Sequence, residues 1–126
     1  MIVTCAIIEK EDKILATQRS ESMHLPLKWE FPGGKILHNE TEIDCIIREI
    51  KEELGILIIP IKRLIPVVHK YEKEITLVPY ISTYMSGNIE LMEHKAYLWL
   101  PKSELISLDW AAADLPIVYQ YLNITL

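Results

Sequence analysis

The sequence predicts an α/β protein in which a mixed β-sheet lies between helices that cover both of its faces (α/β/α). One helical segment lies early in the chain and another near its end, with β-rich segments on both sides of the first. The 126 residues are 50% hydrophobic, enough for a core, and they contain no repeat, low-complexity tract or linker. We therefore expect one domain over residues 1–126.

The first elements are a hairpin and a polar loop. Residues 2–8 and 14–18 read IVTCAII and ILATQ, and the polar residues 9–13 between them predict a turn. A polar loop follows over 19–28, and WEFPGG at 29–34 leads toward the first helix.

That helix is predicted by its ends and by its apolar face. Thr41 and Asp44 have the spacing of a capping box, and Gly55 stands where a C-terminal cap belongs. Five aliphatic residues recur at steps of three and four and predict a stripe that packs on the sheet: Ile43, Ile46, Ile47, Ile50 and Leu54.

The later elements alternate between strands and short helices. Strands are expected at 56–65, 67–70, 75–84 and 97–100, with a turn at Gly87 and Asn88. A helical turn is expected around 104–106, and a final helix at 115–122 has Pro116 in its first turn.

Three glutamates crowd one face of the first helix. Glu49, Glu52 and Glu53 are spaced as neighbours on a helix, where like charges repel. A cation must offset this repulsion, and the sequence offers two solutions: Arg48, four residues before Glu52, or a divalent metal ion that accepts carboxylate oxygen.

Composition limits the class of protein. A net charge of −5 disfavours a nucleic-acid polymer as partner, and no apolar run is long enough to span a membrane. The N-terminus lacks the pattern of a secretory signal, so we expect a cytoplasmic protein, either a monomer or a homodimer. Cys5 and Cys45 are expected to be buried thiols, and His24, His69 and His94 are not at metal-ligand spacing.

The acidic face belongs to a longer pattern. Gly34, five residues, Glu40, seven residues and REIKEELGI at 48–56 together resemble the Nudix box, matched at every specified position of a 23-residue motif. The chain is thereby identified as a member of the Nudix hydrolase superfamily. The resemblance implies the Nudix fold, with a loop–helix–loop that binds Mg²⁺, sometimes Mn²⁺, and cleaves a diphosphate bond in a nucleoside diphosphate linked to another group.

The resemblance also implies roles for residues of the box. Glu49, Glu52 and Glu53 match its metal-binding glutamates, and the carbonyl of Gly33 is a further candidate ligand. Arg48 would orient the glutamates through ion pairs, and Glu40 would have a structural role.

The general base that accepts a proton from the attacking water is left open. Nudix enzymes differ in using a glutamate of the box or one from a distant loop, so Glu53 and Glu93 are both candidates. Glu93 precedes the strand AYLWL, where MutT-type enzymes carry an extra metal-binding glutamate.

A narrower resemblance covers nearly the whole chain. WEFPGGK at 29–35, Gln18-Arg19 and the DLP at 114–116 resemble the MutT-type branch, which implies a (deoxy)nucleoside triphosphate pyrophosphohydrolase. Lys35 would meet a phosphate or be a solvated lysine, and Arg19 would meet phosphate or base or be a surface charge. For Glu30, a structural role and a role near the reaction both stay open.

Asp114 departs from the branch that reads 8-oxoguanine, which carries asparagine at this position. An ionised aspartate only accepts hydrogen bonds and suits an amino group such as that of cytosine, whereas a protonated one can also donate to a carbonyl. Asp114 can equally cap the last helix. Apolar candidates to line a base pocket, with core packing the expected role of most, are Val3, Cys5, Leu77, Pro79 and Trp110.

We therefore predict a Mg²⁺-dependent hydrolase that converts (deoxy)nucleoside triphosphates, including oxidised ones such as 8-oxo-dGTP or cytidine-type ones, to monophosphate and pyrophosphate. Its use would be sanitation of the nucleotide pool and hence DNA repair. The alternatives are a Nudix hydrolase for ADP-ribose or dinucleoside polyphosphates, and a non-catalytic nucleotide-binding module.

Overall fold

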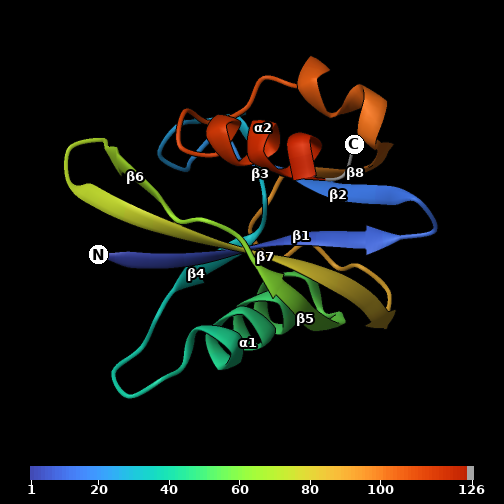
Figure 1. The fold of residues 1–126 in the computed structure, drawn as a ribbon, viewed down its shortest axis with the longest axis horizontal. Helices are drawn as coiled ribbons and strands as arrows, with labels where there is room; N and C mark the ends of the chain where they lie inside the picture. Colours follow the sequence, from blue (N-terminus) through green and yellow to red (C-terminus); the bar gives the residue numbers. More distant parts are fainter. Residues whose placement is uncertain (125–126) are drawn as a thin grey trace.

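A computed structural model describes residues 1–124. Its central layer is a β-sheet, with helix α1 packed on one face and helices η1 and α2 on the other (Figure 1). The elements are β1 Ile2–Lys10, β2 Lys13–Gln18, β3 Trp29–Glu30, β4 Gly33–Lys35, α1 Glu42–Leu54, β5 Leu57–Arg63, β6 Val67–Lys70, β7 Glu74–Ser86, β8 Ala96–Pro101, the 3₁₀-helix η1 Lys102–Ser107 and α2 Leu115–Ile124.

The sheet is mixed, as predicted. Its main order is β3-β2-β1-β7-β5, with β4 paired to β1, β6 to β7 and β8 to β2. Strands β1 and β7 run parallel, with Ile2 opposite Thr76 and Glu9 opposite Thr83, and the other pairs are antiparallel. Strand β1 is therefore central, and it also carries the short strand β4 that leads into α1.

Alternation along the central strands builds two cores. On β1, Cys5 and Ile7 face the α2 side, whereas Ala6 and Ile8 face α1. All four side chains are buried, so β1 is covered on both faces. This explains why its sequence is a continuous apolar run rather than an alternating one.

Local signals place the hairpin and the first helix where the sequence predicts them. Glu11 and Asp12, at the β1–β2 turn, both have positive φ, as a two-residue hairpin turn of type I′ requires. The Thr41 hydroxyl accepts a hydrogen bond from the Asp44 amide at 3.1 Å, and Gly55 ends α1 with φ of 71°. Both caps are confirmed.

The apolar stripe of α1 needs one correction. Ile46, Ile50 and Leu54 are buried as predicted, but Ile43, in the first turn, is 47% exposed. Cys45 is buried instead, where its Sγ lies 3.3 Å from the Thr4 hydroxyl and 3.6 Å from the Gly34 carbonyl oxygen. The helix therefore packs on β1 and β4 through a small side chain at this point, which brings its acidic face close to the glycines.

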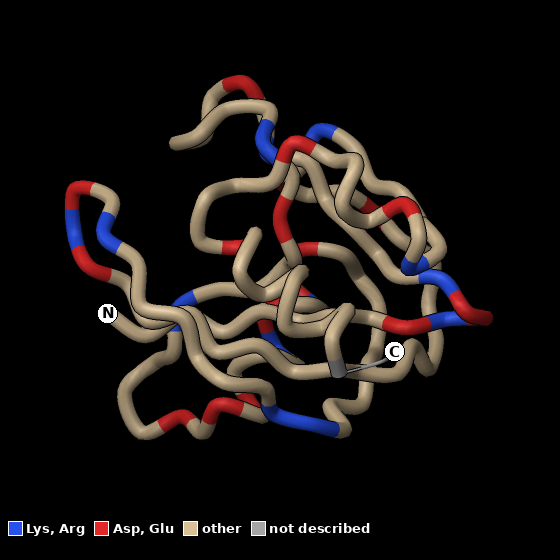
Figure 2. Tube along the Cα trace, turned by 45° about the horizontal axis from the view of Figure 1, so that its top comes forward, with Lys and Arg blue, Asp and Glu red and all other residues tan. Residues whose placement is uncertain are grey.

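Charges are mixed along the chain. Lys and Arg segments alternate with Asp and Glu segments over the molecule (Figure 2). Within residues 1–124, none of the helices has the length and apolar composition that crossing a membrane requires.

Candidate active site

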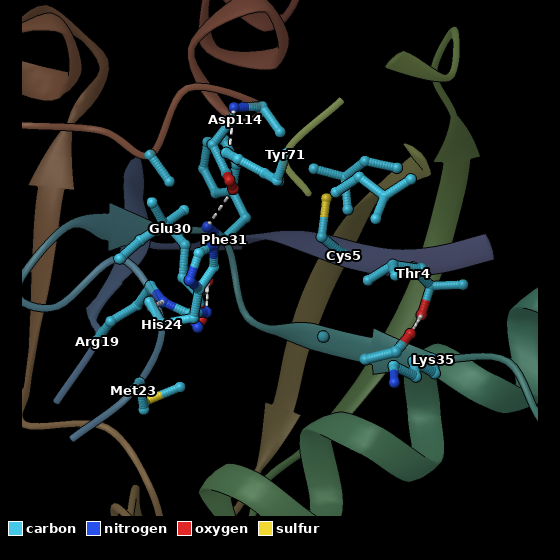
Figure 3. Close-up of a pocket in the computed structure, with 18 of the residues that line it drawn as sticks. Thr4, Cys5, Arg19, Met23, His24, Glu30, Phe31, Lys35, Tyr71 and Asp114 are labelled. Carbon is cyan, nitrogen blue, oxygen red and sulfur yellow. Dashed lines mark hydrogen bonds and ion pairs between the residues drawn. The ribbon is translucent and has the colours of Figure 1, made fainter. Parts of the chain in front are cut away.

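A cavity of about 260 Å³ opens beside β1 and β4 (Figure 3). Asp114, from the approach to α2, stands at one end, and Lys35, from β4, stands at the other. Cys5 lies between them. The lining residues are Val3, Thr4, Cys5, Arg19, Met23, His24, Leu25, Glu30, Phe31, Gly33, Gly34, Lys35, Glu53, Tyr71, Ile75, Leu77, Ala111, Ala113 and Asp114.

The two glycines of β4 are required by close approach. A Cβ on Gly33 would lie 1.9 Å from the Thr4 carbonyl oxygen, inside the backbone of β1. A Cβ on Gly34 would lie 2.3 Å from the carboxylate of Glu49. The strand therefore lies directly against both the sheet and the acidic face of α1 because neither residue has a side chain.

Arg48 gathers the carboxylates next to these glycines. It donates two hydrogen bonds to Glu40, at 2.7 and 2.9 Å, and single ones to Glu49 at 2.8 Å and Glu52 at 3.1 Å. A fifth bond, to the Lys35 carbonyl at 3.2 Å, ties β4 to α1. The Arg48 guanidinium lowers the pKa of Glu40 to about 2. Of the two predicted ways to offset the repulsion, the ion pair with Arg48 is present.

Glu53 sits deeper than its neighbours and lacks such a partner. Its Oε2 is buried and has no hydrogen-bond partner. Burial raises the pKa of Glu53 to about 9, and the negative charges of Glu49, Glu30 and Glu93 add to the shift. A cation bound beside Glu53 would therefore stabilise the ionised form of its carboxyl group.

The carboxylates do not form a completed metal centre in this conformation. Within residues 1–124, no three His, Cys, Asp or Glu side chains converge closely enough to hold a metal ion. Glu49 and Glu52 are turned to Arg48, and the Glu52 side chain is 61% exposed, so packing does not restrain it there.

Glu93 reaches the same region from a distant part of the sequence. It lies in the segment between β7 and β8, whose Met92 amide donates to the Glu53 carbonyl at 3.2 Å. Glu93 is exposed, and its charge contributes to the raised pKa of Glu53. The structure therefore brings together both candidates for the general base.

Arg19 and Glu30 form an ion pair at the cavity wall. The Arg19 Nη1 and a Glu30 carboxylate oxygen are 2.7 Å apart, and the two side chains are only 19% and 17% exposed. The interpretation of Arg19 as a surface charge is therefore wrong. The second Glu30 oxygen lies 2.8 Å from Nε2 of His94, a contact that sequence reasoning missed because the two residues are 64 positions apart.

Asp114 is 5% exposed and its Oδ2 accepts a hydrogen bond from the Phe31 amide at 2.9 Å. Burial and the negative charge of Glu30 raise its pKa. Its backbone carbonyl accepts bonds from the Ile117 and Val118 amides, so Asp114 also begins α2. Asp114 therefore stands at the entry to α2 and lines the cavity, but its side chain bonds to the Phe31 amide, and the bonds to α2 come from its backbone carbonyl.

The other predicted pocket residues divide into two groups. Val3, Cys5 and Leu77 line the cavity, whereas Pro79 and Trp110 are not among its lining residues. Trp110 packs against the ring of Phe31 instead, at 4.7 Å between centroids, and donates a hydrogen bond to the Leu105 carbonyl. Tyr71 lines the cavity and was missed, since nothing in its sequence neighbourhood distinguishes it from other tyrosines on a sheet. Its hydroxyl accepts a hydrogen bond from the Ala113 amide at 2.8 Å.

Comparison with known proteins places the chain in a family. The NUDIX domain model matches residues 1–121. The CTP pyrophosphohydrolase of Escherichia coli (strain K12) is 30% identical over 125 residues, which are 95% of this chain and 90% of that protein. The 8-oxo-dGTP diphosphatase of Proteus vulgaris is 35% identical over 95 residues, 75% of this chain and 83% of that protein.

Solved structures agree. The solution structure of a protein described as DNA mismatch repair protein MutT (family Nudix hydrolase), from methicillin-resistant Staphylococcus aureus 252, matches with a TM-score of 0.78 and 43% identity over 98% of both chains. This chain belongs to the Nudix hydrolase family. Enzymes of this family generally need a divalent metal ion.

Proposed function

We propose that this chain is a Mg²⁺-dependent, MutT-type hydrolase that converts (deoxy)nucleoside triphosphates to the monophosphate and pyrophosphate. The observation that carries the proposal is that one cavity joins a buried acid, Asp114, to the glycines of β4 and to Glu53 of the acidic helix face. A nucleotide has the same two-part chemistry, a polar-edged base and a polyphosphate. The names of the two relatives, one acting on CTP and one on 8-oxo-dGTP, support this class of substrate.

The residues present suit a divalent cation. Mg²⁺ is bound by oxygen ligands. The Oε2 atom of Glu53 is buried and has no hydrogen-bond partner, so it is available to a cation. Glu49, Glu52 and Glu53, with the Gly33 carbonyl and Glu93, would hold the ion. A bound Mg²⁺ would polarise the phosphoryl oxygens and neutralise charge on the departing pyrophosphate. Mn²⁺ has similar ligand preferences and would substitute.

The chain itself supplies orientation and proton transfer. Arg48 holds Glu49 and Glu52 in place and fastens β4 to α1, so that the backbone at Gly33 and Gly34 stays beside the carboxylates. Lys35 is exposed at the end of the cavity opposite Asp114, where it would pair with the triphosphate. Arg19, in the cavity wall, would contact phosphate or base.

Either Glu53 or Glu93 accepts the proton from the attacking water. The two assignments differ in what a glutamine variant does to the pH–rate profile. Substituting the base removes the acidic limb of the profile, whereas substituting a residue that only binds metal lowers the rate and leaves the limb in place. Profiles of Glu53→Gln and Glu93→Gln, measured at saturating Mg²⁺, separate the two.

Asp114 would set the base preference. Its Oδ2 is engaged by the Phe31 amide, so the other oxygen is the one to face a base. Ionised, it would accept a hydrogen bond from the amino group of cytosine; protonated, as its raised pKa favours, it would donate to a carbonyl such as that of 8-oxoguanine.

The test is pyrophosphate release with Mg²⁺ across a panel of 8-oxo-dGTP, dGTP, CTP, dCTP and 5-substituted cytidine triphosphates, with ADP-ribose and dinucleoside polyphosphates as outgroups. Turnover of triphosphates, lost in Glu53→Gln, supports the proposal. Turnover of the outgroups alone would overturn the MutT-type assignment. Nucleotide binding with no turnover of any compound would instead indicate a binding module.

A further inference from the structure

Residues 90–95, the last part of the connection from β7 to β8, are held at both ends. On one side the amides of Glu90 and Met92 donate to the carbonyls of Leu54 and Glu53, at 2.9 and 3.2 Å, where α1 ends. On the other side the Lys95 amide donates to the Gln18 carbonyl at 2.9 Å, at the end of β2. We call residues 90–95 the strap. His94 is the buried residue of the strap; Leu91 is partly buried against the α1 core, and Lys95 pairs with the exposed Glu21 at 3.0 Å.

His94 is buried inside the strap while its neighbour Glu93 is exposed. The imidazole is 1% exposed, and its Nε2 lies 2.8 Å from a Glu30 carboxylate oxygen. Because a carboxylate only accepts, Nε2 is the donor in this bond. The other ring nitrogen, Nδ1, is buried without a hydrogen-bond partner.

An imidazole in this environment is a poor choice for packing alone. A buried polar atom that makes no hydrogen bond destabilises the folded state, and an apolar side chain of similar size would avoid this cost. A leucine would fill the same space but could not make the bond to Glu30. The function of His94 is therefore to hold the strap in place through that bond.

Glu30 holds a second segment at the same time. Its other carboxylate oxygen accepts a hydrogen bond from Arg19 Nη1 at 2.7 Å. Arg19 Nε in turn donates to the His24 carbonyl at 2.5 Å. His24 belongs to the loop 19–28, part of which lines the cavity (Figure 3). The Glu30 carboxylate thus connects the loop 19–28 with the strap at partly buried positions, and the exposed pair of Lys95 with Glu21 adds a surface contact between the same two segments.

We propose that His94 is a positioning residue: through Glu30 it fixes the strap, and so sets Glu93 against Glu53 and couples its position to the loop 19–28. This inference rests on the proposed function for the role of Glu93, but the anchoring of the strap does not. The two parts are tested by separate measurements.

Anchoring is tested by amide hydrogen exchange on the metal-free protein. His94→Leu removes the donor and keeps the bulk, whereas His94→Gln keeps an N–H that can reach Glu30. We expect the Met92 and Lys95 amides to exchange at least tenfold faster in His94→Leu, with recovery in His94→Gln and unchanged exchange in β1. Equal exchange in wild type and His94→Leu would overturn the anchoring.

The role in catalysis is tested by a double-mutant cycle with Glu93→Gln. We expect His94→Leu to lower kcat at least tenfold with KM within about threefold, His94→Gln to restore most of the loss, and His94→Leu to have no further effect when Glu93 is already glutamine. His38→Leu, a change at an exposed histidine of the loop before α1, is the matched control and should leave kcat unchanged.

Additive losses in the cycle would show that His94 does not act through Glu93 and would overturn that part of the inference. Absence of turnover in the wild type, with any nucleotide of the panel, would overturn the proposed function and with it the role of Glu93. The exchange measurement would still decide the anchoring.

Discussion

At the scale of single residues, Asp114 combines two demands that oppose each other. Its carboxyl is buried, which favours the protonated form, yet it accepts the Phe31 amide, which favours the ionised form. Burial wins, since the pKa is raised. The raised pKa favours the protonated form of Asp114, which can donate as well as accept, and this bears directly on the base it can read.

Asp114→Asn should stabilise the protein increasingly as the pH rises. A folded-state pKa above the usual 3.8 means that the contribution of Asp114 to stability is complete below that value and is lost as the pH rises through the raised pKa. Asparagine keeps an oxygen for the Phe31 amide and has no charge to bury. We expect a gain of about 1–2 kcal/mol at pH 8 and little at pH 4, measured by urea unfolding.

The same variant should change base preference. Asparagine both donates and accepts, so the ratio of kcat/KM for 8-oxo-dGTP over CTP should rise by about tenfold, which corresponds to about 1.4 kcal/mol. A variant less stable than wild type at pH 8, with an unchanged ratio, would contradict both expectations.

The role of Arg48 can be tested with lysine, because a lysine ammonium cannot reproduce the planar guanidinium that bonds several carboxylates at once. Arg48→Lys loses the two-bond pairing with Glu40 and cannot also reach Glu49 and Glu52. With the side chain a quarter exposed, we expect a loss of about 1–2 kcal/mol in stability and a fall in kcat. Arg63→Lys is the control: its pairing with Glu42 is half exposed and should change stability by less than about 1 kcal/mol, with kcat unaffected.

At the scale of elements, β4 can pack where it does because Gly33 and Gly34 have no side chains. Gly33→Ala would drive a Cβ into the Thr4 carbonyl, which belongs to the rigid centre of the sheet. In Gly34→Ala the nearest atoms to the new Cβ belong to the Glu49 side chain, which can turn away. We expect Gly33→Ala to unfold or fail to express, and Gly34→Ala to fold with near wild-type circular dichroism but at least tenfold lower kcat. A soluble, active Gly33→Ala variant would contradict this account.

Most of the elements were predictable because their signals are local. The caps of α1, the positive-φ turn after β1 and the proline in the first turn of α2 each depend on a few adjacent residues. The parallel pairing of β1 with β7 does not, since the partners Cys5 and Pro79 are 74 positions apart. No periodicity in either strand selects the other, so the sequence predicts a mixed sheet without its order.

The contacts of the site likewise include some that are encoded locally in the sequence and some that depend on tertiary packing. Arg48 with Glu40 and the three helix glutamates is encoded within 14 residues, and its contacts follow from helical spacing and one short loop. The pair of Glu30 with His94 joins β3 to the strap and depends on how β2 and β8 align. Such contacts arise from tertiary packing, which a single sequence does not reveal.

At the scale of the whole molecule, the site lies where the two faces of the sheet meet different partners. The carboxylates come from α1 on one face, and Asp114 comes from the approach to α2 on the other. The cavity therefore forms only when both cores are assembled. Ligands that bind it should accordingly stabilise the entire fold.

Mg²⁺ should raise the midpoint of thermal unfolding. A ligand that binds only the folded state at 100 times its Kd adds about 2.7 kcal/mol. The physical reason is that the buried Oε2 of Glu53, which has no hydrogen-bond partner, would gain the cation as one, so Glu53→Gln should largely lose the response to Mg²⁺ over EDTA. Glu104→Gln, on the exposed side of η1, should retain it. A wild type whose midpoint is the same in Mg²⁺ and EDTA would contradict metal binding at this site.

The packing of Trp110 on Phe31 also gives the protein an internal optical reporter. Phe31 lines the cavity and its amide is held by Asp114, so an entering base would alter the surroundings of the indole behind it. Trp99 belongs to the opposite core, beside Tyr84, and would serve as a constant background. Intrinsic fluorescence should therefore follow occupancy of the cavity without a label. Trp29 packs on the same core as Trp110, so Trp29→Phe is the matched control: Trp110→Phe should remove the response to the ligand, and Trp29→Phe should retain it.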